Sequence, residues 1–145
     1  MKAMTLNRKK YSLIDHTADF GIQVFGKDPE DLFANAAYAL IDLLTDLRVL
    51  KGNNQKTITV AGSDWPDLMV NWLRELLYLW SGHELLVKSV KIQEITPCEI
   101  SASLSYDRYD PVRHVIKDEI KAVTYHQIQV VRFPQGWEAR VIFDV

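Results

Sequence analysis

The pattern of apolar and polar residues along the chain predicts two long helices. The first begins after Asp28, a residue type that caps helices, with Pro29 at the first helical position. Its apolar residues recur at helical spacing and are Phe33, Ala36, Leu40, Leu43, Leu44 and Leu47. The second helix begins around residues 63–67, ends near Ser81–Gly82 and is apolar almost all round. We expect it to lie in the centre of the core, with a docking groove as the alternative.

Shorter segments in which apolar and polar residues alternate predict β-strands. The expected strands are Tyr11–Ile14, Phe20–Phe25, Lys56–Val60, Leu85–Ile95, Glu99–Tyr106, Ile120–Phe133 and Trp137–Val145. The last two are joined by a sequence typical of a hairpin turn, Pro134-Gln135-Gly136. The predicted class is therefore α+β, with two long helices packed against an antiparallel β-sheet. We expect residues 1–145 to form one domain, in which 1–10 are a flexible basic N-terminus.

Composition narrows the classes of protein to which the chain can belong. It has 145 residues, of which 48% are hydrophobic, and these suffice for one substantial core. The 17 basic residues are balanced by 19 acidic ones, so direct binding to nucleic acid is not expected. The longest apolar stretch, 68–80, is interrupted by polar and charged residues, so we expect no membrane span. A single cysteine fits the reducing cytoplasm.

The usual catalytic signatures are missing from the sequence. It has no Gly-rich phosphate loop, no G-x-S-x-G turn, no H-E-x-x-H pair and no paired C-x-x-C motifs. The four histidines and Cys98 do not have the spacing of a zinc site, and we expect Cys98 to be an inert core thiol. A hydrolase that uses an Asp/His cluster is the enzyme alternative, but no nucleophile is paired with a recognisable base.

Several carboxylates occupy positions where a negative charge is unfavourable. Asp15 and Asp19 share a tight segment between two predicted strands. Asp42 and Asp46 are four residues apart near the end of the first predicted helix, where mutual repulsion and the helix dipole both oppose them. A divalent cation would relieve these repulsions, because calcium and magnesium prefer oxygen ligands. Turn capping by the first pair and a solvated helix face for the second are the alternatives.

Three further residues have two interpretations each. Asp144 lies next to the α-carboxylate of Val145, so this end of the chain could add to a cation site. His16 is either a loop residue that hydrogen-bonds locally or part of a site. Lys121 is either a solvated neighbour of an acid or a contact for a phosphate or carboxylate of a partner.

Five segments, taken in order, resemble the signature sequences of the archease family. The first contains His16-Thr17-Ala18-Asp19, followed by Phe20-Gly21, and resembles the family's H-T-A-D-x-G motif. The others are Ala39–Leu43, Trp72–Trp80, Lys121–His126 and Val141–Val145. Each segment alone is a weak signal, whereas five in the family's order are specific, and together they span the chain from about Tyr11 to Val145.

The resemblance implies a small cytosolic α+β protein that assists the GTP-dependent RNA ligase of tRNA splicing and RNA repair. That ligase joins a 2′,3′-cyclic phosphate or 3′-phosphate end to a 5′-hydroxyl, and it uses a guanylylated histidine and a divalent metal. The resemblance implies that the archease promotes guanylylation and multiple turnover of this ligase and is not an enzyme itself. Its link to tRNA would therefore be indirect. A chaperone or adaptor for another RNA-modifying enzyme, such as an RNA methyltransferase, is the alternative function.

The resemblance also implies a metal pocket, which the family shows with calcium. Its residues correspond here to Asp19, Asp144 and the C-terminal carboxylate of Val145, with Asp42 as a further candidate. Magnesium or manganese could replace calcium, because the same carboxylates serve all three ions.

Two more residues are implied by the resemblance to be functional, and a third marks a departure from it. Lys121 corresponds to the family's functional lysine, and His16 in the first signature is a candidate for partner contact. Many relatives carry a Gly-Glu pair before a Pro-x-x-His segment, where this chain has Tyr106-Asp107. Asp107 keeps the charge with a shorter reach, and its role stays open.

Overall fold

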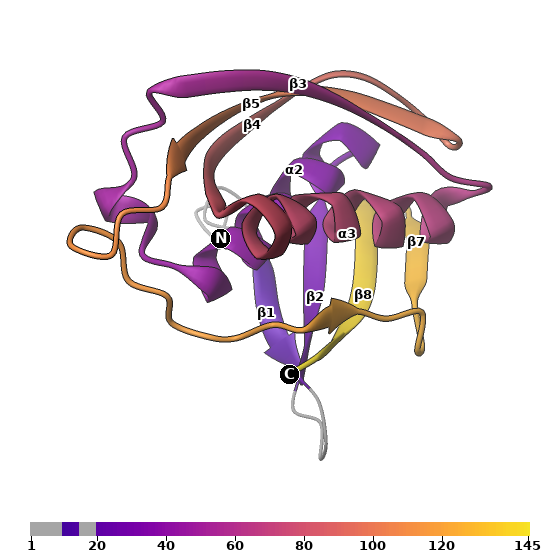
Figure 1. The fold of residues 1–145 in the computed structure, drawn as a ribbon. Helices are drawn as coiled ribbons and strands as arrows, with labels where there is room; N and C mark the ends of the chain where they lie inside the picture. Colours follow the sequence, from indigo (N-terminus) through magenta and orange to yellow (C-terminus); the bar gives the residue numbers. More distant parts are fainter. Residues whose placement is uncertain (1–9, 15–19) are drawn as a thin grey trace, which may run out of the picture.

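The computed structural model describes residues 10–14 and 20–145, so most of the expected N-terminal segment lies outside it (Figure 1). The described residues form eight strands, two α-helices and one short 3-10 helix. In order they are β1 (Tyr11–Ile14), β2 (Phe20–Gly26), α2 (Pro29–Leu44), η1 (Leu47–Val49), β3 (Asn54–Ala61), α3 (Trp65–His83), β4 (Leu85–Thr96), β5 (Glu99–Arg108), β6 (Ala122–Val123), β7 (Gln129–Phe133) and β8 (Gly136–Asp144).

Two antiparallel sheets enclose the two helices (Figure 1). The larger sheet has the strand order β1-β2-β8-β6, with β7 also paired to β8, and the smaller one has the order β3-β5-β4. Helix α2 packs against β2 and β4, and α3 packs against β3 and β6. The predicted α+β class with antiparallel strands is confirmed, and the strands are divided between two sheets. An all-round apolar helix such as α3 requires cover on opposite sides, which two sheets provide.

Both helices begin with the same capping arrangement. The Oδ1 of Asp28 accepts the backbone N–H of Asp31 at 2.8 Å, and the Oδ1 of Asp64 accepts that of Asp67 at 2.9 Å. These bonds satisfy backbone donors that the first helical turn leaves free. The predicted helix starts are therefore confirmed to within a residue or two.

The aromatic residues of α3 belong to the core, as predicted. Trp72 is fully buried, and its indole N–H donates to the carbonyl oxygen of Phe33 at 2.9 Å. This bond joins the two helices inside the core, and it satisfies a polar group that would be costly to bury alone. Within the described residues, neither helix is long and apolar enough to cross a membrane.

The first helix is shorter than its apolar stripe predicted. It ends at Leu44, because Thr45 adopts an extended conformation with φ −152° and ψ 174°. Asp46 then caps η1, and its carboxylate pairs with Arg48 at 2.9 Å. The hydrogen bonds from Arg48 lower the pKa of Asp46 to about 2. The prediction that Asp42 and Asp46 share a helix face is therefore wrong.

The predicted strand Ile120–Phe133 is wrong, because a turn divides it into β6 and β7. Gln127 in this turn has φ 53°, a left-handed conformation that no continuous strand contains. Val123 is buried and faces the core, whereas Lys121 and Tyr125 are exposed and face solvent.

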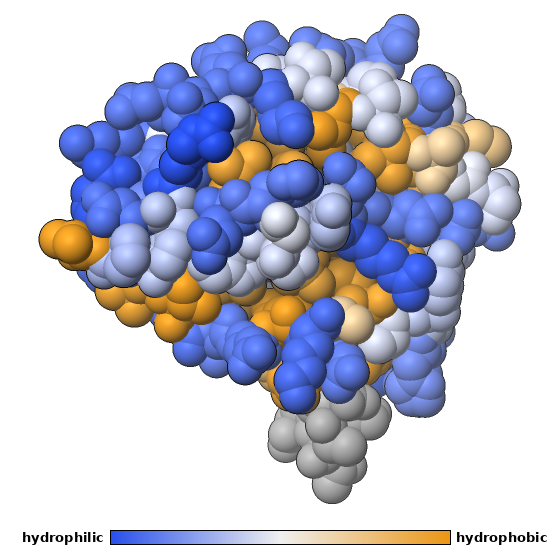
Figure 2. All heavy atoms as spheres, viewed as in Figure 1, coloured by the Kyte–Doolittle hydropathy of each residue, from blue (hydrophilic) through white to orange (hydrophobic). Residues whose placement is uncertain are grey.

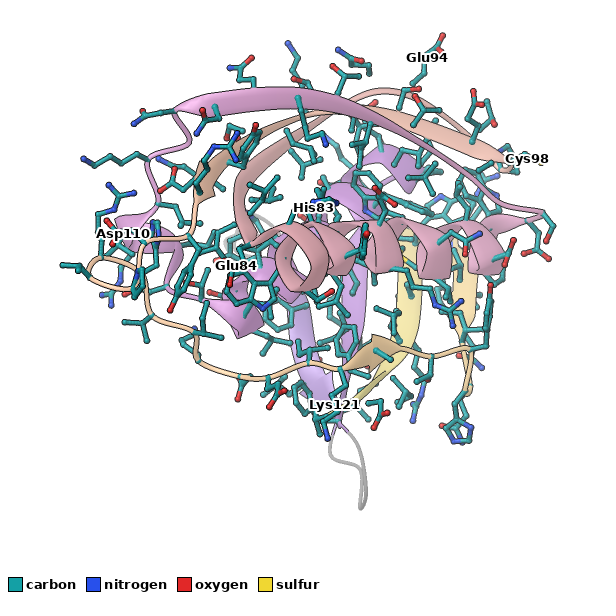
Figure 3. The ribbon with its side chains drawn as sticks, in the orientation of Figure 1. His83, Glu84, Glu94, Cys98, Asp110 and Lys121 are labelled. Carbon is teal, nitrogen blue, oxygen red and sulfur yellow. The ribbon has the colours of Figure 1, made fainter. Side chains whose placement is uncertain are left out.

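Cys98 is exposed, so the prediction of a core thiol is wrong. It lies in the tight turn between β4 and β5, at the end of a long hairpin (Figure 3). The backbone N–H of Cys98 donates to the Oγ1 of Thr96 at 3.2 Å. Cys98 is therefore exposed because it lies in a turn, and the apolar residues of the flanking strands do not indicate this.

Candidate functional site

The structure places Lys121 beside Asp144 at one end of the larger sheet. The backbone N–H of Lys121 donates to the carbonyl oxygen of Asp144 at 2.7 Å, and Ala122 is paired with Asp144 in the β6–β8 register. Both side chains are exposed, and Lys121 lies at the same end of the molecule as the C-terminus (Figures 1 and 3). Val145 follows directly and is 41% exposed. A cationic side chain and carboxylates therefore meet at one solvent-facing edge.

Two predicted site residues, His16 and Asp19, lie outside the described residues. Strand β2 begins at Phe20, the residue that follows Asp19 in the sequence. Phe20 is paired with Phe143, and their rings make an edge-to-face contact with centroids 6.1 Å apart. The start of β2 is therefore fixed next to the end of β8, which carries the predicted Asp144.

Asp42 binds a tyrosine. The hydroxyl of Tyr11 donates to its Oδ2 at 2.7 Å, which joins β1 to α2. Partial burial and this hydrogen bond raise the pKa of Tyr11. The contacts of the described residues join Asp42 to β1, and none of them joins it to Asp144.

A metal site built from side chains is not found in the part of the chain that the structure describes. Within residues 10–14 and 20–145, no three His, Cys, Asp or Glu side chains are close enough to hold an ion. The predicted set includes Asp19 and the C-terminal carboxylate of Val145, and the first of these lies outside the described residues. The metal pocket therefore stays a prediction.

Asp107, whose role the sequence left open, is the centre of a buried hydrogen-bond network. Only 3% of it is exposed, and its carboxylate accepts the backbone N–H groups of Gly52 at 2.6 Å and Lys51 at 3.0 Å. Arg113 adds an ion pair at 3.1 Å, and His114 Nε2 lies 3.0 Å away. Burial alone would raise the pKa of Asp107, but these donors outweigh burial and lower it.

Three groups contact the ring nitrogens of His114, and the backbone donor among them sets its tautomer. Its Nδ1 accepts the backbone N–H of Asp110 at 2.9 Å, so this nitrogen carries no proton. Nε2 is then the protonated nitrogen and donates to Asp107, and the Nη2 of Arg113 also lies 3.1 Å from it. The contact is a hydrogen bond between a neutral ring and a carboxylate. The network therefore anchors the loop after β5 from inside, and Asp107 has little surface to offer a partner.

A separate hollow of about 260 Å³ lies between α2, β4 and the start of β1. Its lining includes Lys10, Tyr38 and Val90, and none of the predicted site residues. This hollow and the Lys121–Asp144 edge therefore lie in different parts of the molecule.

Comparison with known proteins identifies the family. The model of the archease protein family matches residues 11–145 of the chain. This chain belongs to the archease family. It is similar to the protein archease of Methanosarcina barkeri, with 34% identity over 146 residues that cover 98% of this chain and 100% of that protein. The archease of Pyrococcus furiosus is 33% identical over 141 residues, which cover 94% of this chain and 99% of that protein.

A solved structure supports the same assignment. The solution structure of Methanobacterium thermoautotrophicum protein 1598 aligns with a TM-score of 0.78 and 30% sequence identity. The alignment covers 94% of this chain and 99% of that one. The archease resemblance predicted from five short segments is therefore confirmed over almost the whole length.

Proposed function

We propose that this member of the archease family is an accessory protein of a GTP-dependent RNA ligase in the cytoplasm. In this proposal it promotes guanylylation of the ligase and multiple turnover, and it does not catalyse ligation itself. The observation that best supports the proposal is the position of Lys121 beside Asp144. These residues come from two different signature segments, and the β6–β8 pairing unites them at one exposed edge.

The same edge is suited to a divalent cation, which we propose as part of the function. Asp144 and the terminal carboxylate of Val145 supply hard oxygen donors, and Asp19 precedes the strand paired with β8. Calcium takes about 6–8 oxygen ligands, and magnesium or manganese would accept the same donors. A bound ion would add positive charge where the ligase holds nucleotide phosphates. Asp42 is a weaker candidate, because one of its oxygens is already bonded to Tyr11.

Lys121 and Asp144 have different tasks in this proposal. The exposed ammonium group of Lys121 can bind a phosphate or a carboxylate of the ligase, and the carboxylate of Asp144 can hold the ion. A role as a hydrolase is less well supported. In the described part of the chain, His114 and Asp107 form a His–carboxylate hydrogen bond of 3.0 Å, and both residues are buried. This pair cannot reach a substrate.

The test is RNA ligation by the cognate ligase with substrate in excess, with and without this protein. We expect a change from single to multiple turnover, which Asp144→Ala abolishes. Asp118→Ala is the matched control, because Asp118 is also an exposed aspartate but lies in a loop. An active ligase that shows no change would contradict the proposal. Equal loss in both variants would contradict the assignment of Asp144.

Two further assays separate the alternative functions. Turnover of cyclic-phosphate RNA by the isolated protein would show an enzyme. Suppression of aggregation of several clients, such as an RNA methyltransferase, without any dependence on GTP would instead favour a chaperone or adaptor.

A further inference from the structure

The strand next to Lys121 is too short to hold this residue by backbone pairing alone. Strand β6 has two residues, Ala122 and Val123, which pair with Asp144 and Phe143 of β8, and single backbone bonds from Lys121 and Thr124 to β8 flank them. A pairing of this length is marginal in water, so other contacts must fix the segment. Thr124 donates twice to the carbonyl oxygen of Ile142 in β8, and the remaining contacts come from α3.

Helix α3 carries a polar stripe on the side that faces this segment. Asp67, Asn71 and Arg74 recur at intervals of four and three residues, which places them on one face of the helix. The visible face of α3 is largely hydrophilic, with apolar surface on both sides of it (Figure 2). Eight residues of the helix are buried, and none of the three residues of this stripe is among them.

Arg74 makes two contacts with the segment at the same time. Its Nε donates to the carbonyl oxygen of Val123 at 3.0 Å, and its guanidinium carbon lies 4.7 Å from the centroid of the Tyr125 ring. The Tyr125 hydroxyl in turn donates to the Oδ1 of Asp67 at 2.6 Å. Two residues of α3, Asp67 and Arg74, therefore hold the segment at both Val123 and Tyr125.

We propose that Arg74 and Tyr125 form a clamp that positions Lys121 beside Asp144. Val123 is 1% exposed, so its carbonyl oxygen depends on a partner inside the protein. The planar guanidinium of Arg74 can donate to this oxygen and stack on the ring of Tyr125 simultaneously, which an ammonium group cannot do. Lys121 lies only two residues before Val123, so the clamp fixes the position of the Lys121 backbone at the edge of the sheet.

The role of Lys121 in this inference rests on the proposed function, whereas the clamp itself does not. Arg74 acts through Lys121 and is therefore a positioning residue. The clamp itself predicts a local property that can be measured without a ligase. The Lys121 amide is protected by its 2.7 Å bond to Asp144 and becomes open to solvent if β6 leaves β8.

The first experiment is amide hydrogen exchange by NMR on the full chain. We expect Arg74→Lys to accelerate exchange at Lys121 by about tenfold, because a bond from a charged donor is lost. Exchange in the centre of β2 and the melting temperature should change little. Arg132→Lys, at an exposed arginine of β7, is the matched control. Unchanged exchange at Lys121 would overturn the clamp, and so would uniform acceleration along the chain.

A second variant, Tyr125→Phe, tests the clamp even if Arg74→Lys folds poorly. Tyr125→Phe retains the ring under the guanidinium and removes the bond to Asp67. We expect a smaller acceleration of exchange at Lys121 than with Arg74→Lys. Exchange at wild-type rates in Tyr125→Phe would remove this residue from the clamp and contradict the proposal.

Ligation assays then separate the clamp from the proposed function. If both hold, Arg74→Lys and Lys121→Ala both reduce maximal stimulation of the ligase, and Arg132→Lys does not. If exchange at Lys121 rises in Arg74→Lys while Lys121→Ala stimulates fully, the clamp stands and the task of Lys121 is wrong. If Lys121→Ala abolishes stimulation while Arg74→Lys leaves both exchange and stimulation unchanged, the clamp is wrong.

Discussion

At Asp107, where several donors bind one buried carboxylate, we expect a single substitution to have a large effect on the free energy of unfolding. Asp107→Asn keeps the size of the side chain but cannot accept the backbone N–H groups of Lys51 and Gly52 and the ion pair of Arg113 together. Removing one partner of such a network is strongly destabilising, and we expect a loss of about 3 kcal/mol in the free energy of unfolding. Urea denaturation measures it. Asp118→Asn, an exposed aspartate in a nearby loop, should change stability by less than about 0.5 kcal/mol, and equal losses would contradict the assignment.

The same carboxylate predicts how stability depends on pH. The donors around Asp107 lower its pKa in the folded protein, despite burial. Asp107 therefore stabilises the fold above the ordinary carboxyl pKa of about 4, and this contribution is lost as the pH falls through the lowered value. The stability difference between wild type and Asp107→Asn should be constant at mildly acidic and neutral pH and should shrink below about pH 4. A difference that grows on acidification would contradict the sign.

The Asp107 network also shows what residue patterns could not predict. Asp107 and His114 are seven residues apart, and Lys51 and Gly52 are 56 and 55 residues from Asp107. No local spacing indicates a carboxylate that binds a distant loop. In β5 the buried apolar residues Ile100, Ala102 and Leu104 alternate, and this alternation would place Asp107 on the opposite face, so the pattern contained no signal for its burial.

Capping residues link the sequence to the helices, and their contribution can be measured. Asp64 accepts the N–H of Asp67 at the start of α3, the helix that carries the core Trp72 and the clamp Arg74. Asp64→Ala should lower the free energy of unfolding by about 1 kcal/mol, whereas Asp64→Asn should cost much less, because asparagine also caps well. Thermal or urea unfolding provides the comparison. Equal costs for the two variants would show that the cap contributes nothing.

The ends of helices and strands were predicted well where a particular residue type, such as a capping aspartate, fixes them. They were predicted poorly where contacts with distant parts of the chain fix them. The cap at Asp28 fixed the start of α2, but the apolar stripe ran on to Leu47, past the true end at Leu44. The same limit applies to the predicted strand Ile120–Phe133, in which apolar residues continue through a turn. The spacing of Asp67, Asn71 and Arg74 is that of one helix face, but the helix was predicted to be apolar almost all round and no polar stripe was expected. The partner of this stripe, the segment around Tyr125, lies far along the chain.

At the scale of the whole molecule, the sheet order decides which predicted site residues meet. Local patterns predicted antiparallel strands, but they did not indicate that β6 would pair with β8 beside the C-terminus. The family resemblance named Lys121 and Asp144 separately, and nothing in the sequence predicted their meeting at one edge. The structure adds its physical cause, the bond of 2.7 Å between the two backbones. Asp19 and His16 stay predictions, because they lie outside the described residues.

The proposed metal provides a last prediction that involves the whole fold. If calcium binds the folded chain only, stability should rise by about 2.7 kcal/mol when the free ion reaches about 100 times its dissociation constant. The melting temperature should therefore increase with calcium, fall again with a chelator, and be insensitive to both in Asp144→Asn. The matched control is Asp118→Asn, which should respond like wild type.

Lys121→Met separates metal binding from ligase activation in the same titration. Removing a positive charge beside the carboxylates should tighten calcium binding, because like charges repel at short range. The variant should nevertheless fail to stimulate the ligase, since the group proposed to contact the partner is gone. A wild-type melting temperature that does not respond to calcium, magnesium or manganese would contradict a metal at this edge. Weaker calcium binding in Lys121→Met would instead show that the lysine supports the site directly, and the two proposed tasks would then belong to one group.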